Sequence, residues 1–427
     1  TTGANNVAVG SGALDASTTG SENTAVGQGA LGASTTASYN TAVGREALGA
    51  STTGTANTAM GQSAGITQTT ASGCTFIGTN AGRTNNTNDN VAVGQGALYA
   101  NTTGQYNTAI GPGQYGITQG PLGSNTTGDS NTACGAKALL GNTTGNYNTA
   151  LGNAALTTNS TSNNNSALGY LALQLCTAGN NTGIGYKALQ NTSTGADNTA
   201  LGTGAAVTNT TGDKNTAIGK DALNQNSTAD LNVAIGFQAL YQNTGEKNVH
   251  VGGYAADQNT TGAYNVVIGY NASQGNTTGS SNVCIGYKAG NTGNGDNQLY
   301  IARSNGGAGS ASQWIVGDSN GACFQGNNNS AWSTTSDERL KKNIVDNHKG
   351  LAEINQLRVT SFEYKKEDEI DMSEFPLSND PHQIVLGEGH AKTTNTGVIA
   401  QEVESVLPEC ITVSNFGAKT VQSDPIM

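Results

Sequence analysis

The chain has 427 residues and a formal net charge of −11 at pH 7, and 35% of its residues are hydrophobic, with 60 glycines and only six phenylalanines. The acidic balance, without any run of Lys and Arg interleaved with aromatic residues, argues against nucleic acid as a partner. No stretch approaches eighteen apolar residues, so the sequence predicts no membrane insertion.

A pentapeptide that closes on glycine recurs seventeen times between residues 6–10 and 282–286. Successive closing glycines are 16 or 17 residues apart, except for one interval of 24 between Gly111 and Gly135. A fixed period this short predicts a solenoid whose repeats pack only against their neighbours. Each repeat is too short for a strand, a crossover helix and a return strand, but it suffices for one rung of a parallel β-roll. At about 4.8 Å per rung, the seventeen rungs make a rod of roughly 80 Å.

The two residues before each closing glycine are the expected core. The last is apolar in all seventeen copies, and the one before it is Ala in twelve. We expect the last one to point inward and to align from rung to rung, as in Val9, Val26, Val43, Ile110, Ile218 and Ile285. A second apolar pair, such as Ala30-Leu31, follows in most copies and predicts a second short strand beyond the glycine corner.

The cysteines and the opening residue of the repeat also bear on the interior. The six cysteines are scattered without a CxxC pair, and Cys134 and Cys284 fall on expected core positions, which predicts small buried hydrophobes in a protein folded in a reducing cytoplasm. Asn opens sixteen of the seventeen copies, and Cys74 is the exception. Two interpretations remain open: a stacked ladder of Asn amides, or a preference for turn geometry.

The interval of 24 residues contains Tyr115 and Pro121 and is expected to bulge from an otherwise even rod. It is a candidate contact loop, with a neutral surface insertion as the alternative.

The composition divides the chain into three parts. Residues 1–302 hold 20 charged residues, whereas residues 336–427 hold 25 in a much shorter segment. We therefore expect a β-roll rod over 1–302, a β-rich connector over 303–335 and a small α+β domain over 336–427. The rod has a thin core of Ala, Val and Ile, and identical rods could pool their apolar faces around a closed symmetry axis.

The repeat unit Asn-Thr-Ala-Val-Gly with its following Ala-Leu resembles the head repeats of the YadA-like trimeric autotransporter adhesins, over residues 1 to about 302. The resemblance implies a left-handed parallel β-roll and a homotrimer of three rolls packed side by side. The repeats here are longer than the usual unit of that family, which places the extra residues in the Thr, Ser, Gly and Asn loop.

The C-terminal part resembles the intramolecular chaperone of endosialidase family, also called the peptidase S74 domain. The resemblance rests on Ser336 to Ile344 (SDERLKKNI), Gly397 to Val403 (GVIAQEV) and Leu407 to Glu409 (LPE). It implies a domain at the C-terminus of phage tail fibres and spikes that assists trimerisation and then cuts itself off with a Ser-Lys dyad. On this chain the match gives Ser336 as nucleophile and Lys341 as base, and it implies that a C-terminal helix is missing beyond the end of this sequence.

General chemistry also supports a Ser-Lys dyad, apart from the resemblance. A serine hydroxyl needs a base, and a desolvated lysine amine is neutral enough to serve as one. Lys342 is a rival base. The alternative is that Ser336 only caps a helix on which Glu338 and Lys342 form an exposed pair.

Taken together, the sequence predicts a mainly β structural and host-attachment fibre, a phage tail fibre or spike located in the virion after synthesis in the host cytoplasm. The expected partners are two further copies of the chain and a host cell-surface receptor, with a glycan as one candidate. The alternatives are a bacterial trimeric adhesin at the cell surface and a tailspike that degrades polysaccharide. The only expected catalysis is self-cleavage, and no cofactor or metal ligand set is expected.

Overall fold

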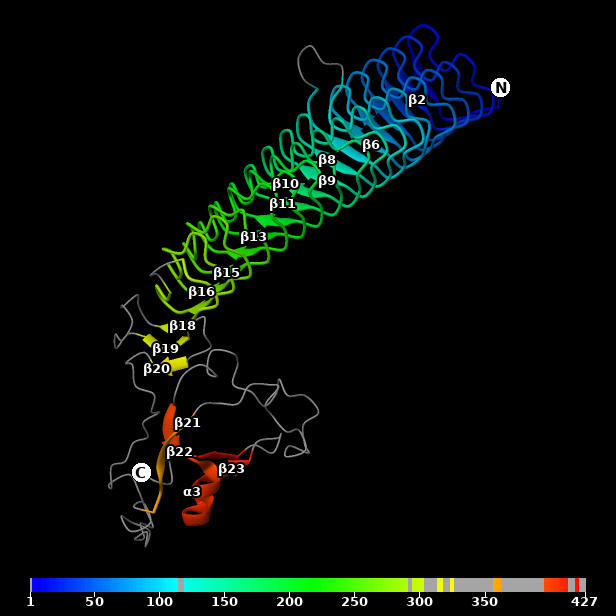
Figure 1. Cartoon of the computed structure of the whole chain (residues 1–427). Coiled ribbons are helices and arrows are strands. Elements are labelled where there is room, and N and C mark those ends of the chain that lie inside the picture. Colours follow the sequence, from blue (N-terminus) through cyan, green and yellow to red (C-terminus); the bar gives the residue numbers. More distant parts are fainter. Residues whose placement is uncertain are drawn as a thin grey trace, which may run out of the picture. The chain divides into compact units, whose positions relative to one another are not determined.

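The computed structural model describes residues 2–113, 119–290, 294–302, 313–317, 323–325, 356–362, 395–413 and 419–421. The chain divides into two compact units, Thr1–Trp332 and Ser333–Met427. The first unit contains the rod of stacked turns in Figure 1. The described residues are mainly β, and they include a single short α-helix, which lies near the C-terminus.

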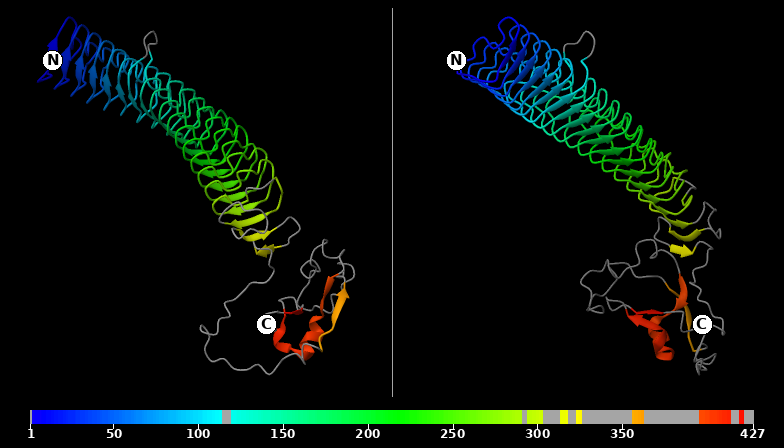
Figure 2. Two further views of the ribbon diagram at one scale, coloured as in Figure 1. Left: turned by 90° about the vertical axis from the view of Figure 1, so that its left-hand side faces the viewer. Right: turned by 180° about the vertical axis from the view of Figure 1, so that it is seen from behind.

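Each pentapeptide supplies one strand of three residues, and each strand pairs in parallel with the strand of the next turn. The strands therefore lie in one row along the rod (Figure 2). They are β1 (Val7–Val9), β2 (Thr24–Val26), β3 (Thr41–Val43), β4 (Thr58–Met60), β5 (Thr75–Ile77), β6 (Val91–Val93), β7 (Thr108–Ile110), β8 (Thr132–Cys134), β9 (Thr149–Leu151), β10 (Ser166–Leu168), β11 (Thr182–Ile184), β12 (Thr199–Leu201), β13 (Thr216–Ile218), β14 (Val233–Ile235), β15 (Val249–Val251), β16 (Val266–Ile268) and β17 (Val283–Ile285). The predicted parallel β-solenoid with turns of about seventeen residues is confirmed.

The predicted register of the strands is wrong by one residue. The middle residue of the strand, such as Ala25 or Ala42, is fully buried. The residue before the glycine points outward, and the residues expected inside are therefore exposed or half-buried: Val9, Val26, Val43, Ile110, Ile218 and Ile285. The reason is the alternation of side chains along a strand, which allows only one of two adjacent apolar residues to face the interior.

The second apolar pair does not form a strand, contrary to the prediction. Ala30 and Leu31 are fully buried, but they lie in a turn, and Leu31 has a φ of 49°. The turn is still tied to its neighbour, since the Leu31 N–H donates to the Ala47 carbonyl oxygen at 3.0 Å. The left-handed backbone aims the leucine at the core, where it packs against the small alanine of the strand.

The closing glycine has no space for a side chain. Gly27 has a φ of 136°, and a Cβ on it would lie 2.4 Å from the carbonyl oxygen of Gly44 in the next turn. The pentapeptide closes on glycine because both the backbone conformation and the approach of the neighbouring turn require it.

The opening asparagines form the predicted ladder. The Asn40 N–H donates to Oδ1 of Asn23 at 3.0 Å, and the Asn40 Nδ2 donates to the Gly54 carbonyl oxygen at 2.9 Å. The Asn40 side chain thus satisfies two buried backbone groups of the next turn, because its Oδ1 also accepts the Asn57 N–H at 2.9 Å. The left-handed backbone conformation that the turn needs is adopted by the residue before the asparagine, since Tyr39 has a φ of 62°.

The ladder continues across the longest repeat. Strand β8 pairs with β7 in the same register as elsewhere, with Thr108 opposite Thr132, and Asn131 donates its N–H to Oδ1 of Asn107 at 2.9 Å. The adjoining rungs keep their period, as expected. Tyr115 lies outside the described residues, so the predicted contact loop stays a prediction.

One turn exchanges large and small residues inside the core. Phe76 is fully buried at the strand position that usually holds Ala, and the corner position that usually holds Leu is glycine in the same turn and in the turn before, at Gly82 and Gly65. A Cβ at Gly82 would lie 2.4 Å from the Phe76 ring, and one at Gly65 would lie 2.8 Å from it. The phenylalanine therefore occupies the space of two missing leucines.

The rod ends where the sheet changes direction. Strand β18 (Leu299–Ala302) still pairs in parallel with β17, whereas β19 (Gln313–Gly317) and β20 (Cys323–Gln325) add in antiparallel fashion. The second unit has β21 (Val359–Phe362) paired with β22 (Asn395–Val398), helix α3 (Ala400–Val406), the 3-10 helix η5 (Pro408–Cys410), and β23 (Ile411–Val413) paired with β24 (Lys419–Val421).

Candidate functional site

The outward side of the strand row is an uncharged, largely apolar surface. The first and third residues of β1 to β17, 34 residues in all, are Val, Ile, Leu, Met, Cys, Thr or Ser, and none is charged. We call this surface the strand face. The first residue is Thr, Val or Ser, and the third is the apolar residue before the closing glycine. All charged side chains of the rod lie on its turns instead.

Many of these side chains are open to solvent. Among them Val9 is 56%, Leu168 49% and Leu201 45% exposed. Soluble proteins rarely leave so long an apolar surface uncovered, so such a surface indicates an interface. The sequence prediction missed the strand face because the residue before the glycine was assigned to the core.

Cys134 lies on the strand face and is exposed, which corrects its predicted burial. Cys284 is the middle residue of its strand and is buried as expected, and burial raises the pKa of its thiol to about 11. Cys74 and Cys176 are also buried. Cys134 is therefore the accessible thiol among the free cysteines described in the rod.

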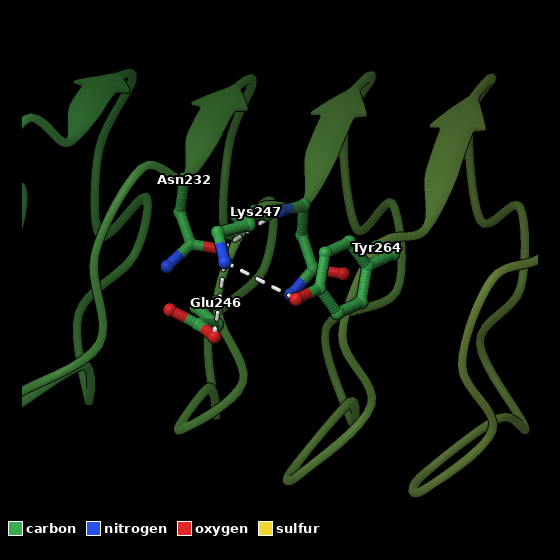
Figure 3. A network of polar contacts seen from close by, with 5 residues as sticks. Asn232, Glu246, Lys247 and Tyr264 are labelled. Atoms are coloured by element: carbon green, nitrogen blue, oxygen red, sulfur yellow. Dashed lines mark hydrogen bonds and ion pairs between the residues drawn. The ribbon is translucent and has the colours of Figure 1, made fainter.

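The turns carry the polar surface, and one of its contact networks is shown in Figure 3. Lys247 Nζ donates to the Tyr264 hydroxyl at 3.1 Å and to Oε1 of Glu246 at 3.3 Å, and it lies 5.0 Å from the centre of the Tyr264 ring. The hydrogen bond from Lys247 to Tyr264 and the contact with Glu246 raise the pKa of the lysine. Because these groups are exposed, the network orders a surface patch without contributing much to stability.

The second unit has a small core of its own. Val403 on α3 is fully buried with Cys410 and the nearly buried Leu407, and Leu357, Val406, Ile411 and Val421 pack against them. The N-terminal end of α3 is held by an ion pair between Arg358 and Glu402 at 2.5 Å, and Lys419 on β24 pairs with Glu404. The sequence motif at 397–403 therefore spans the end of β22 and the start of α3.

The predicted dyad cannot be built from the described residues. Ser336, Lys341 and the rival Lys342 all lie outside them, so the assignment of nucleophile and base stays a prediction. Elsewhere in the described part of the chain, no group of three or more His, Cys, Asp or Glu side chains could hold a metal ion. Within the same residues, no helix has the length and apolar character needed to cross a membrane.

Residues 336–412 match the family model described as chaperone of endosialidase, peptidase S74. The C-terminal part of the chain is thus a chaperone-of-endosialidase domain, and it follows a parallel β-solenoid of seventeen turns with a period of about seventeen residues. This combination fits a protein of the phage tail fibre or spike type. Neither a search of curated proteins nor a search of solved structures gives a match to the chain.

Proposed function

We propose that this chain is a host-attachment fibre of a phage virion that works as a homotrimer. In this proposal the solenoid is the shaft, and its turns present polar loops to a receptor on the host cell. The C-terminal domain assists assembly and then releases itself by self-cleavage. The observation that carries the proposal is the uncharged strand face, which runs along all seventeen turns of a solenoid that is followed in the sequence by a domain of a chaperone family.

The size of the strand face supports self-association. If each of the seventeen apolar residues before the closing glycines exposes roughly 60 Å², the face offers about 1,000 Å² per chain, and a standard interface covers about 800 Å² per partner. An interface of this composition resembles the apolar core of obligate oligomers. A closed symmetry axis leaves no copy of the face uncovered.

The periodicity of the face supports parallel packing of the copies. Its side chains repeat at the rise of one turn, and an identical rod in parallel register presents the same repeat. A slip by one turn would leave nearly the same apolar contacts, because successive turns are alike on this face. A folding aid that aligns three chains at their C-terminal ends removes that ambiguity, which is a physical reason for the chaperone domain.

Cys134 offers a direct test of this packing. In a parallel threefold assembly through the strand face, the three copies of Cys134 lie at one level near the axis. Mild oxidation of the native full-length protein should then give a covalent dimer on a denaturing gel, with the third chain left single. The Cys134→Ser variant should give no such band while light scattering still reports three chains. A monomer in light scattering would exclude the assembly.

The self-cleavage follows the chemistry of a Ser-Lys dyad. The Ser336 hydroxyl attacks the carbonyl carbon of the adjacent peptide bond while the Lys341 amine accepts its proton, and that proton then passes to the leaving amine. Water hydrolyses the resulting ester and restores the hydroxyl. The denatured mass of the purified protein tests this step, because a cut beside Ser336 gives two pieces in place of one chain.

A further inference from the structure

A row of aromatic rings lies on the corner that follows the closing glycines in the C-terminal half of the rod. Its members are the first or second residue after the glycine in their turns: Tyr170, Tyr186, Phe237, Tyr254, Tyr270 and Tyr287. Tyr170, Tyr186, Tyr270 and Tyr287 are each 48% to 50% exposed. We call these six residues the aromatic row. It spans seven steps between turns, or about 34 Å.

The rings of the aromatic row contact one another. Tyr170 and Tyr186 stack with their centres 5.6 Å apart. Farther along, Tyr254 bridges Phe237 and Tyr270 by edge contacts at 5.1 and 5.8 Å, and Tyr270 stacks on Tyr287 at 6.1 Å. The row is therefore a continuous surface over turns 14 to 17 and a stacked pair over turns 10 and 11.

The backbone under the row is fixed by bonds between turns. The Phe237 carbonyl oxygen accepts the Tyr254 N–H at 2.8 Å, and the Tyr270 carbonyl oxygen accepts the Lys288 N–H at 3.0 Å. Each ring is thus held to the next rung and by its neighbouring rings. A surface ordered in this way loses little conformational entropy when a ligand binds.

Positive charge gathers on the same corner. Lys187 lies 5.2 Å from the centre of the Tyr186 ring, Lys220 lies 5.5 Å from that of Phe237, and Lys288 lies 5.4 Å from that of Tyr287. These are three of the eight basic residues between residues 1 and 302. Within turns 10 to 17, only Asp221, which pairs with Lys220 at 3.7 Å, places an acidic side chain on the same positions, and Glu46 does so in the third turn, outside the row. The row is locally positive on a chain whose net charge is −11.

From this arrangement we infer that the aromatic row binds an acidic polysaccharide. The C–H face of a sugar ring carries slight positive charge and stacks on the negative face of an aromatic ring, while the lysines pair with the carboxylates of the polymer. A linear polymer can follow a linear row, and several weak contacts along it add up through multivalency. The inference rests on the proposed attachment function and names its receptor class.

The same features argue against a second copy of the chain as the occupant. The row lies beyond the glycine corner and shares no residue with the strand face. If two copies met row against row, Lys187, Lys220 and Lys288 would approach their own counterparts and repel. The strand face, which holds no charge, is the surface suited to self-association.

Retention of the native full-length protein in gels that contain alginate, hyaluronate or colanic acid tests the inference, with dextran as the neutral comparison. We expect retention by at least one acidic polymer, weakening as salt rises, and none by dextran. A Tyr270→Ala/Tyr287→Ala variant should bind about tenfold more weakly, and a Lys187→Gln/Lys288→Gln variant should lose the salt dependence. The matched control is Tyr39→Ala/Tyr147→Ala, which removes two rings that are 63% and 65% exposed outside the row and should bind normally.

Several results would overturn the inference. These are no retention by any of the three acidic polymers, equal retention by dextran, or unchanged binding of the Tyr270/Tyr287 variant. Loss of the trimer in that variant would make the row a contact between copies and would also overturn it. Cross-linking through Cys134 reports assembly separately, so intact cross-links without polysaccharide binding refute only the inference, whereas a monomeric protein refutes the proposed function itself.

Discussion

Replacing Phe76 with Ala should open a cavity in the fifth turn that the neighbouring turns cannot close. The ring is fully buried, and its space is bounded by Gly65 and Gly82, which carry no side chain that could move in. Truncation of a buried phenylalanine to alanine costs about 3 to 5 kcal/mol. We expect a loss in this range because the turn is held only by its two neighbours.

The loss should be local, so hydrogen exchange is the suitable assay. A solenoid does not unfold as one cooperative unit, and a single melting temperature would average over its turns. Amides of β5 and of the adjoining strands should exchange about two to four orders of magnitude faster in the variant, while those of β13 should not change. The distant strand serves as the internal control.

Restoring the usual pattern should rescue the variant. Leu48 and Leu98 occupy the equivalent corner position with a φ of 50°, so leucine is compatible with that backbone. The Phe76→Ala/Gly65→Leu/Gly82→Leu variant should therefore recover most of the lost protection. The Gly82→Leu change alone should destabilise the protein, because its Cβ would lie within 2.4 Å of the ring. A triple variant that exchanges as fast as Phe76→Ala would refute this account of the core.

Four further outcomes are expected. Ile218→Lys places a charge on the strand face and should convert the proposed trimer to single chains in light scattering. Asn40→Ala removes a ladder residue and leaves buried backbone groups unpaired, which should cost about 2 to 4 kcal/mol in local hydrogen exchange. Burial lowers the pKa of His250 from 6.5 to about 3. Below pH 6.5 the unfolded chain therefore binds a proton on this histidine that the folded chain does not bind, so the free energy of unfolding should fall as pH drops from 6.5 toward 3. His250→Ala should remove about 3 kcal/mol of that loss per chain at about pH 4, measured by hydrogen exchange of the β15 amides at pH 4 and 7. Ser336→Ala and Lys341→Met should each leave a single full-length chain where the wild type gives two pieces, and cleavage in both variants would exclude the dyad.

The period of the closing glycines was sufficient to predict the solenoid, since seventeen residues are too few for a strand, a crossover helix and a return strand and suffice for one rung. The period was not sufficient to predict the register of the strands, because Ala25 and Val26 are both apolar and composition does not decide which of them faces inward. The sizes of the residues contain the missing signal. The buried position is Ala in twelve of the seventeen copies because a narrow coil favours a small side chain, whereas the exposed one varies among Val, Met, Ile, Leu and Cys.

Other features depend on contacts that a single repeat does not reveal. The left-handed φ of Leu31 follows from the packing of the corner, because leucine avoids that region by itself. The aromatic row, including Tyr170 and Tyr186, was not predicted from the sequence. Their shared position just after the glycine was the available signal. The dyad was predicted from its resemblance and lies outside the described residues.

The uniform pairing of each strand with the next has a consequence for how such a fibre changes over generations. Every turn presents the same parallel strand pairing to the turns on either side, so most turns can follow one another. The turn of Phe76 is an exception, because its ring needs a glycine at the corner of the turn before it. Unequal recombination between the repeats of the gene would add or delete whole turns and leave the joints intact. The shaft can therefore lengthen or shorten in steps of about 4.8 Å. In the proposed attachment function, the exposed side chains on the turns can change without altering this pairing, so that reach and receptor preference vary independently.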